Sequence, residues 1–333
     1  MDVDRRTRLL DVLLARTVGP VVGHTTEQRA ALRRRNGPPL VGRLLHGRPA
    51  AGVTTADLPV PGGDDDVPVR LYIPPGPAPA AGRPLVVAFP DGGWVYAGLG
   101  TSSWLCSRVA AGAGALVAEV GYRTAPEHPA PAAHLDSYAA TVWLAEHAHA
   151  LGGRADRVAL LGDGAGGTLA ATVALDAHDR GRPSLAFQAL ICPATDLTLA
   201  SPSIVERADG PLLRSSDLRS CVDLYLGDLA DPRDPLLSPL LAASHRGLPP
   251  ALVVTAEHDP LRDDGLRYVD RLRVDGVAVQ HAEVPGSAHG FFAFAGACRR
   301  TAAPALEILV AALRRALGGA AGPSAASSPS AAR

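Results

Sequence analysis

The sequence contains no lysine, a single methionine and few aromatic residues, which make up 4% of its 333 residues. All 32 basic residues are therefore arginines, and 33 aspartates and glutamates balance them to a formal net charge of −1. A chain without a net positive charge has no overall electrostatic attraction to nucleic acid or to an anionic membrane. We therefore expect a small-molecule partner and no nucleic-acid partner.

Cysteines and long apolar runs are also scarce. Cys106, Cys192, Cys221 and Cys298 are far apart and form no C-x-x-C pair, so we expect no disulfide framework and no metal site. We also expect no cofactor. No stretch reaches 18 uninterrupted apolar residues, which argues against a membrane span. The N-terminal residues lack the apolar core and cleavage site of a signal peptide. We expect a cytoplasmic protein.

Short apolar runs alternate with helical patterns over most of the chain. Expected strands are 67–73, 84–89, 115–122, 157–161, 187–192, 251–255 and 277–284, and expected helices are 101–113, 131–150, 167–180, 261–274 and 298–316. This alternation predicts an α/β fold with a doubly wound, mostly parallel sheet and helices on both faces. Such sheets bind ligands at the carboxyl ends of their strands, so the loops that begin at Pro90, Gly162, Glu257 and Pro285 are the candidate site.

One of these loops, GDGAGG over residues 162–167, allows two interpretations. As a nucleophile elbow, G-x-S-x-G, it would carry a serine at its apex, where this sequence has Gly164. As G-x-G-x-x-G, it would bind the pyrophosphate of a dinucleotide. The residues of the other loops are needed to distinguish between these two interpretations.

Seven segments together resemble the hormone-sensitive-lipase branch of the carboxylesterases, within the α/β-hydrolase superfamily. They run in family order between about residues 55 and 315: DGGW (91–94), YRTAPEHP (122–129), GDGAGG (162–167), SPL (238–240), GLPP (247–250), DPLRD (259–263) and HGF (289–291). The dinucleotide interpretation explains one of the seven, so we favour the hydrolase interpretation.

The resemblance implies a catalytic pair and an oxyanion hole. It implies that Asp259 is the carboxylate of a catalytic triad and His289 its base. The alternatives from local sequence are a helix N-cap for Asp259 and a surface loop position for His289. The resemblance also implies that the backbone N–H groups of Gly92, Gly93 and Ala165 form the oxyanion hole.

Two positions depart from the family pattern. Gly164 stands at the position of the nucleophile serine, whose loss lowers turnover by a factor on the order of 10⁶. The family loop reads His-Gly-Gly-Gly where this chain has Pro90, Asp91, Gly92 and Gly93. Asp91 either is exposed and braces the loop or acts as a second acid/base group, and it would repel an oxyanion if it pointed into the hole. The nearby hydroxyls and thiol (Ser102, Ser103, Cys106 and Ser287) are less plausible replacement nucleophiles.

These departures favour a non-hydrolytic enzyme over a serine esterase. His289, held by Asp259, would catalyse dehydration, cyclisation or isomerisation of a small carbonyl or acyl substrate. The alternatives are a catalytically silent binding protein and a residual hydrolase of activated esters or thioesters.

By resemblance, residues 51–317 form the hydrolase core, and residues 1–50 and an insertion at about 200–229 form a helical cap. Trp94 and Tyr96 are candidate substrate-binding residues, with core packing as the alternative. Residues 318–333 are of low complexity, and we expect them to be disordered. A homodimer stays open as an alternative to a monomer.

Overall fold

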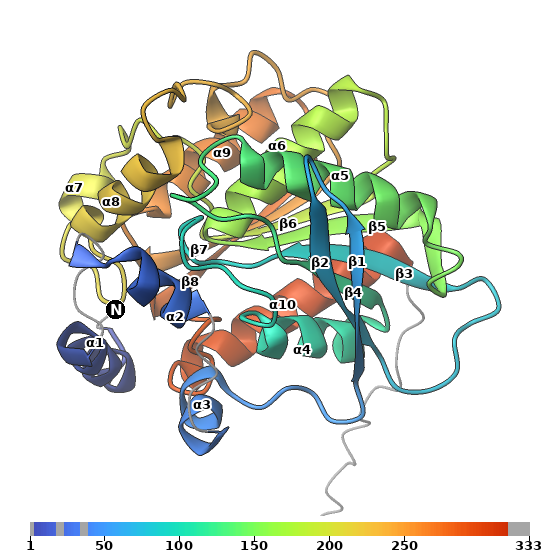
Figure 1. The fold of residues 1–333 in the computed structure, drawn as a ribbon, viewed down its shortest axis with the longest axis horizontal. Coiled ribbons are helices and arrows are strands. Elements are labelled where there is room, and N and C mark those ends of the chain that lie inside the picture. Colours follow the sequence, from blue (N-terminus) through green and yellow to red (C-terminus); the bar gives the residue numbers. More distant parts are fainter. Residues whose placement is uncertain (1–2, 18–22, 34–38, 319–333) are drawn as a thin grey trace, which may run out of the picture.

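The computed structural model describes residues 3–17, 23–33 and 39–318. In this part of the chain, eight strands form one sheet in the order β1-β2-β4-β3-β5-β6-β7-β8 (Figure 1). Strands β1 and β2 pair antiparallel, as do β2 and β4, and all other neighbours are parallel. The strands are β1 Thr54–Pro61, β2 Asp66–Ile73, β3 Arg83–Phe89, β4 Leu116–Val120, β5 Gly153–Asp163, β6 Phe187–Ile191, β7 Ala251–His258 and β8 Val279–Ala288.

Helices cover both faces of the sheet. Helices α4 and α10 lie on one face, and α5, α6 and α9 lie on the other (Figure 1). Every residue of β3, β4 and β6 is buried, which explains why these strands are mostly apolar. Each contains one charged or amide residue, Arg83, Glu119 and Gln188 respectively. The helices are α4 Ser103–Ala113, α5 Ala132–Glu146, α6 Ala165–Asp179, α9 Arg262–Val274 and α10 Arg299–Leu317. The predicted fold class is confirmed.

Further helices gather beside the carboxyl ends of the parallel strands. They are α1 Arg5–Thr17, α2 Thr26–Arg33, α3 Pro39–His46, α7 Ser203–Glu206 and α8 Ser215–Leu226; a short 3₁₀ turn, η2, spans Pro239–Leu241. Figure 1 shows α1, α2, α7 and α8 at the same end of the molecule. Asp11 of α1 accepts the N–H of Leu212 at 3.1 Å, which ties the N-terminal helix to the segment before α8.

None of the helices in the described ranges is both long enough and apolar enough to cross a membrane. Residues 319–333, nearly all of the expected disordered tail, lie outside those ranges.

Candidate active site

Four loops meet at the carboxyl edge of the parallel strands. They follow β3, β5, β7 and β8, and they carry Asp91, Gly164, Asp259 and His289 in that order. Since neighbouring parallel strands all end at the same edge, residues far apart in the sequence come together there.

The turn between β5 and α6 has the shape of a nucleophile elbow. Its apex, Gly164, has φ 52° and ψ −118°, a conformation that glycine adopts at little cost and that strains other residues. The turn is also very tight, because a Cβ on Gly162 would lie 2.0 Å from the carbonyl oxygen of Gly166. A Cβ on Gly166 would lie 2.0 Å from the carbonyl oxygen of Phe89.

The same turn offers little to a dinucleotide phosphate. The N–H of Gly164 donates to the carbonyl of Ile191 at 2.8 Å, and the N–H of Gly167 donates to the carbonyl of Gly164 at 2.9 Å. The N–H of Ala165 donates to Asp91. These amides are already bonded within the protein, so the glycines serve the tight turn and not a phosphate cradle.

Asp259 and His289 form the expected pair. Nδ1 of His289 lies 2.9 Å from Oδ2 of Asp259, and both side chains are buried. Oδ1 of Asp259 also accepts the N–H of Leu261 at 2.8 Å, so this carboxylate fixes the start of α9 as well as the imidazole. His289 is not at the surface: 8% of it is exposed.

Asp91 points toward the backbone amides that the resemblance assigns to an oxyanion hole. Its Oδ1 accepts the N–H of Ala165 at 3.1 Å and that of Gly93 at 3.4 Å, and its Oδ2 lies 3.5 Å from Nε2 of His289. Two of the three backbone groups assigned to the hole are therefore bonded to a carboxylate of the protein. The carbonyl of the third, Gly92, closes the loop by accepting the N–H groups of Val95 and Tyr96.

The Asp91 carboxylate also fills the space beside the elbow apex. A Cβ built on Gly164 would lie 2.1 Å from Oδ1, 2.4 Å from Cγ and 2.8 Å from Oδ2 of Asp91. A side chain at position 164 and this position of Asp91 exclude each other.

The charges around His289 favour its protonated form. Burial alone would lower the pKa of His289, but the charge and hydrogen bond of Asp259, together with those of Asp91, raise it well above its usual value. Burial alone would raise the pKa of Asp91, but the hydrogen bond and charge of His289 and backbone N–H donors hold it below its usual value. Both directions favour a charged His289 ring between the side chains of Asp91 and Asp259, and we call these three groups the ion triplet.

Sequence reasoning did not single out Asp163 and Cys192, which lie near this ion triplet. Burial and the charge of Asp91 raise the pKa of Asp163 to about 8. Its place next to the elbow apex, at the end of a buried strand, was the signal that could have identified it. Cys192 is fully buried, and its position after β6, at the same sheet edge, was the corresponding signal.

Cys192, Asp259 and His289 bring three potential metal ligands within 4.8 Å of one another. They fit a metal poorly. The Nδ1 of His289 is bonded to Asp259, and burial raises the pKa of the Cys192 thiol well above its usual value, whereas a metal binds the thiolate.

Trp94 and Tyr96 make protein contacts. The Trp94 ring is buried and stacks on Tyr225 of α8, with centroids 4.7 Å apart and 7° between the planes. Tyr96 is partly exposed, and its hydroxyl lies 2.8 Å from Nδ1 of His24. Trp94 is therefore packed in the core, as the alternative interpretation had it. Tyr96 connects the loop to the N-terminal segment.

Three of the four alternative nucleophiles, Ser103, Cys106 and Ser287, are engaged elsewhere. Ser103 donates to the carbonyl of Gly100, and Ser287 donates to that of Val284 at 2.7 Å. Cys106 is fully buried in the core on the α4 and α10 face. No hydrogen bond in the described part of the chain connects these three groups to His289.

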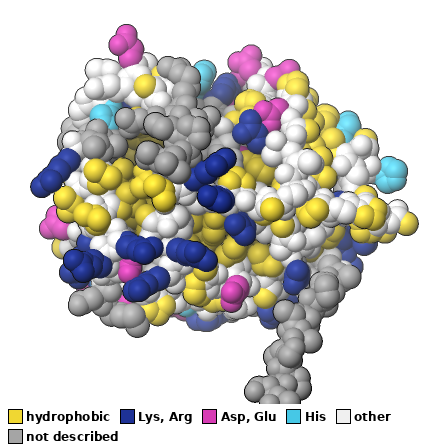
Figure 2. Space-filling view, turned by 90° about the horizontal axis from the view of Figure 1, so that it is seen from below, with side chains coloured by type: hydrophobic (Ala, Val, Ile, Leu, Met, Phe, Trp, Pro, Cys, Tyr) yellow, Lys and Arg dark blue, Asp and Glu magenta, His cyan; other side chains and the backbone are white. Residues whose placement is uncertain are grey.

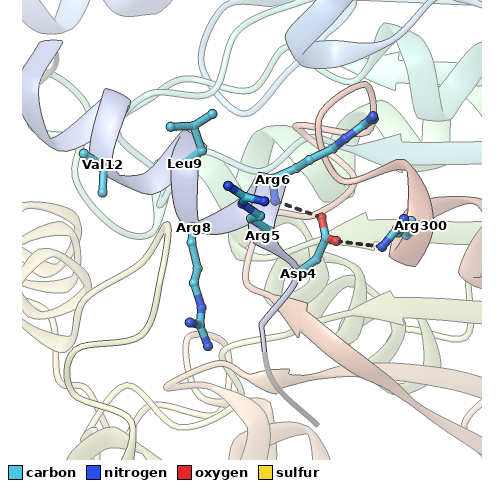
Figure 3. Close-up of a pocket in the computed structure, with 7 residues that line it drawn as sticks. All are labelled: Asp4, Arg5, Arg6, Arg8, Leu9, Val12 and Arg300. Carbon is cyan, nitrogen blue, oxygen red and sulfur yellow. Dashed lines mark hydrogen bonds and ion pairs between the residues drawn. The ribbon is translucent and has the colours of Figure 1, made fainter.

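A shallow hollow beside α1 lies apart from the ion triplet. Figure 2, a view from below, shows basic side chains around apolar ones on this part of the surface. In Figure 3, Asp4 binds the N–H of Arg6 at 3.2 Å and contacts Arg300 at 3.6 Å. The lining residues are Asp4, Arg5, Arg6, Arg8, Leu9, Val12 and Arg300. This hollow holds none of the candidate catalytic groups.

Comparison with known proteins identifies the family of the fold. Residues 86–293 match a family described as alpha/beta hydrolase fold. The carboxylesterase NlhH of Mycobacterium tuberculosis is 43% identical over 255 residues, 76% of this chain and 79% of that protein. Esterase LipI of the same species is 41% identical over 242 residues, 72% of this chain and 75% of that protein.

Among solved structures, a serine-to-alanine mutant of LAE6, an alpha/beta hydrolase enzyme from the metagenome of Lake Arreo, superposes with a TM-score of 0.87. It is 33% identical, and the match covers 95% of this chain and 99% of LAE6. The chain therefore belongs to the α/β-hydrolase fold family and, within it, to the carboxylesterase-like proteins.

Proposed function

We propose that this chain is a small-molecule enzyme that lacks the serine nucleophile of its esterase relatives and works by acid/base chemistry. Its reaction would be a dehydration, cyclisation or isomerisation of a small carbonyl or acyl compound, without a cofactor. One observation carries the proposal: Nε2 of His289 faces the Asp91 carboxylate across 3.5 Å, beside an elbow apex that has no side chain.

The ion triplet supplies both halves of a proton transfer. In a dehydration, the Asp91 carboxylate takes the proton from the carbon next to the substrate carbonyl. The His289 imidazolium gives its Nε2 proton to the departing hydroxyl, which leaves as water. The proton on Asp91 then returns to Nε2 of His289. Asp259 holds the ring in one orientation and stabilises its charge throughout.

The position of Asp91 affects the role expected of the Gly93 and Ala165 amides in binding a substrate oxygen. Because Gly93 and Ala165 already donate to Asp91, a substrate oxygen binds there only after the carboxylate has moved. The resting geometry therefore favours Asp91 and His289 as the reacting groups over stabilisation of an enolate in the hole. The same observation favours the second candidate, a silent binding protein in which the ion triplet is structural.

The cap remains a proposal, with residues 1–50 and about 200–229 as its two parts. Its support is contact with the site loop: a Cβ on Gly93 would lie 2.8 Å from Sγ of Cys221 in α8, and Trp94 stacks on Tyr225. The small-molecule substrate, the cytoplasmic location and the choice between monomer and homodimer stay predictions.

The test is a panel of small β-hydroxy esters and ketones incubated in D₂O and followed by NMR. We expect loss of water, or deuterium uptake next to the carbonyl, for at least one member. His289→Ala should reduce the rate by about 10²–10⁴-fold, while the exposed control His147→Ala should leave it unchanged.

Three results would contradict the proposal. Equal rates for the wild type and His289→Ala would remove the proton-transfer role. Binding of panel members without any conversion would support the silent binding protein. Rapid turnover of p-nitrophenyl acetate with an initial burst would reveal an overlooked nucleophile.

A further inference from the structure

The Asp91 carboxylate lies almost where a carboxylate carried by the elbow residue would lie. Its Cγ is 2.4 Å from the Cβ position of residue 164, and its two oxygens are 2.1 and 2.8 Å from that point. The apex of the elbow is thus occupied by an ionised group, although the group comes from the loop after β3.

The two oxygens of Asp91 have different surroundings. Oδ1 is held by the N–H groups of Ala165 and Gly93, whereas Oδ2 faces Nε2 of His289. Of the side-chain surface of Asp91, 19% remains exposed, compared with 9% for His289. The carboxylate is therefore the more exposed of the two groups.

We propose that Asp91 is a covalent nucleophile, and that the chain hydrolyses small epoxides through an ester on this side chain. The proposal goes beyond the acid/base function above, and it rests on that function for the proton-carrying role of His289.

The expected electrophile follows from the chemistry of a carboxylate. A carboxylate is too weak a base to expel the alkoxide of an ordinary ester, because the conjugate acid of alkoxide is far weaker than a carboxylic acid. It can open a strained carbon–oxygen bond when an acid protonates the departing oxygen. The imidazolium of His289 supplies that acid, which favours an epoxide over an unactivated ester or ether.

The first step forms the ester. Oδ2 of Asp91 attacks one epoxide carbon, the ring carbon–oxygen bond breaks, and the released oxygen takes the Nε2 proton of His289. The products are an alkyl ester of Asp91 with a free hydroxyl, and a neutral imidazole.

The second step releases a diol. Neutral His289 takes a proton from water, and the hydroxide adds to Cγ of Asp91. The negative charge then develops on Oδ1, where Ala165 and Gly93 already donate. The carbon–oxygen bond to the alkyl group breaks, and the alkoxide takes the proton from His289. The new carboxylic acid returns its proton to His289, which restores the ion triplet. One epoxide and one water have become one diol.

The test uses the full chain and phenyl glycidyl ether in H₂¹⁸O, with peptide mass spectrometry. We expect diol formation in the wild type, and after several turnovers we expect ¹⁸O in the peptide that contains Asp91. Protein incubated without the epoxide should stay unlabelled. Asp91→Asn should abolish both signals, and Asp228→Asn, an exposed carboxylate after α8, should retain both.

A second probe traps the ester. Benzyl bromide needs no proton on its leaving group, so it should alkylate Asp91 in His289→Gln as well as in the wild type. Because His289 activates the water, we expect the ester in His289→Gln to hydrolyse about 10²–10⁴-fold more slowly than in the wild type.

The outcomes separate this proposal from the proposed function. If the Asp91 peptide carried neither ¹⁸O nor a benzyl ester, the proposed role of Asp91 as a nucleophile would be wrong. The acid/base function would survive if His289-dependent dehydration persisted. If the ester on Asp91 hydrolysed equally fast in His289→Gln and in the wild type, Asp91 would still be a nucleophile. His289 would then not activate the water.

Discussion

At the scale of single residues, the site depends on the pairing of Asp91 with Gly164. Glycine leaves the apex open, and the carboxylate enters that opening to within 2.1 Å of where a Cβ would be. Neither residue explains the site alone. Asp91 at this position needs a glycine at the apex, and an apex glycine alone would leave the hole donors unoccupied.

This dependence predicts non-additive substitutions. Gly164→Ser alone should gain no esterase activity, because the new side chain collides with Asp91. Gly164→Ser combined with Asp91→Gly should hydrolyse p-nitrophenyl acetate at least about 10²-fold faster than either single variant, since it gains a hydroxyl and frees the hole donors. The matched control, Gly164→Ala with Asp91→Gly, has the space without the hydroxyl and should stay inactive. A single Gly164→Ser variant as active as the double variant would contradict the mutual exclusion.

The sequence was sufficient for part of this site. The motif resemblance predicted that Asp259 and His289 act as a pair, and their side chains lie 2.9 Å apart. The orientation of Asp91 could not be predicted. It depends on distances of 3.1–3.5 Å to two amides and an imidazole from other segments, and these distances exist only after the loops have packed.

The ion triplet should also make stability depend on pH. The raised pKa of His289 means that its contribution is complete below about pH 6.5 and is lost as the pH rises through the folded-state pKa. The lowered pKa of Asp91 means that its contribution is present above about pH 4 and is lost as the pH falls further. The ion triplet therefore stabilises the fold most between these values.

His289→Gln removes the cation between two carboxylates. We expect it to lower the free energy of unfolding by about 3 kcal/mol near pH 5.5, and by less near pH 9.5. Urea unfolding at both pH values measures the difference, with the exposed His147→Gln as a control. The same loss at both pH values would mean that the ring acts only through packing.

At the scale of secondary structure, the buried strands could be predicted from the sequence, whereas the exposed edge strand could not. Strands β3 and β6 are buried on both faces, and their apolar runs identified them. Strand β1 was not predicted, because seven of its eight residues are not fully buried and its sequence, TTADLPVP, includes two prolines. Its position at the edge of the sheet makes both features tolerable. Helix α3 was also missed, since its eight residues follow a stretch broken by proline and glycine.

The contact between α8 and the site loop leads to a prediction at this scale. Tyr225 of α8 is 1% exposed and stacks on Trp94, so Tyr225→Leu should lower the free energy of unfolding by about 2–3 kcal/mol. It should also speed the reaction of Cys221, whose thiol lies near Gly93 and has its pKa raised to about 12 by burial. Urea unfolding and thiol labelling measure the two effects. Unchanged labelling of Cys221 would show that α8 does not depend on this stack.

At the scale of the whole molecule, membership in the fold family does not by itself determine the chemistry. The fold follows that of the esterase relatives over most of the chain. Gly164 lies at the apex of the elbow, and the Asp91 carboxylate accepts the N–H groups of Ala165 and Gly93 beside it. If the proposed function holds, a few side chains at one edge of the sheet set the chemistry on a shared fold.

Side-chain ¹⁵N NMR of the histidines tests this account most directly. We predict that both ring nitrogens of His289 carry protons at neutral pH, that the ring titrates well above its usual pKa, and that Asp91→Asn lowers that pKa. A His289 ring that is neutral at pH 7 and unaffected by Asp91→Asn would contradict the ion triplet and the functions built on it.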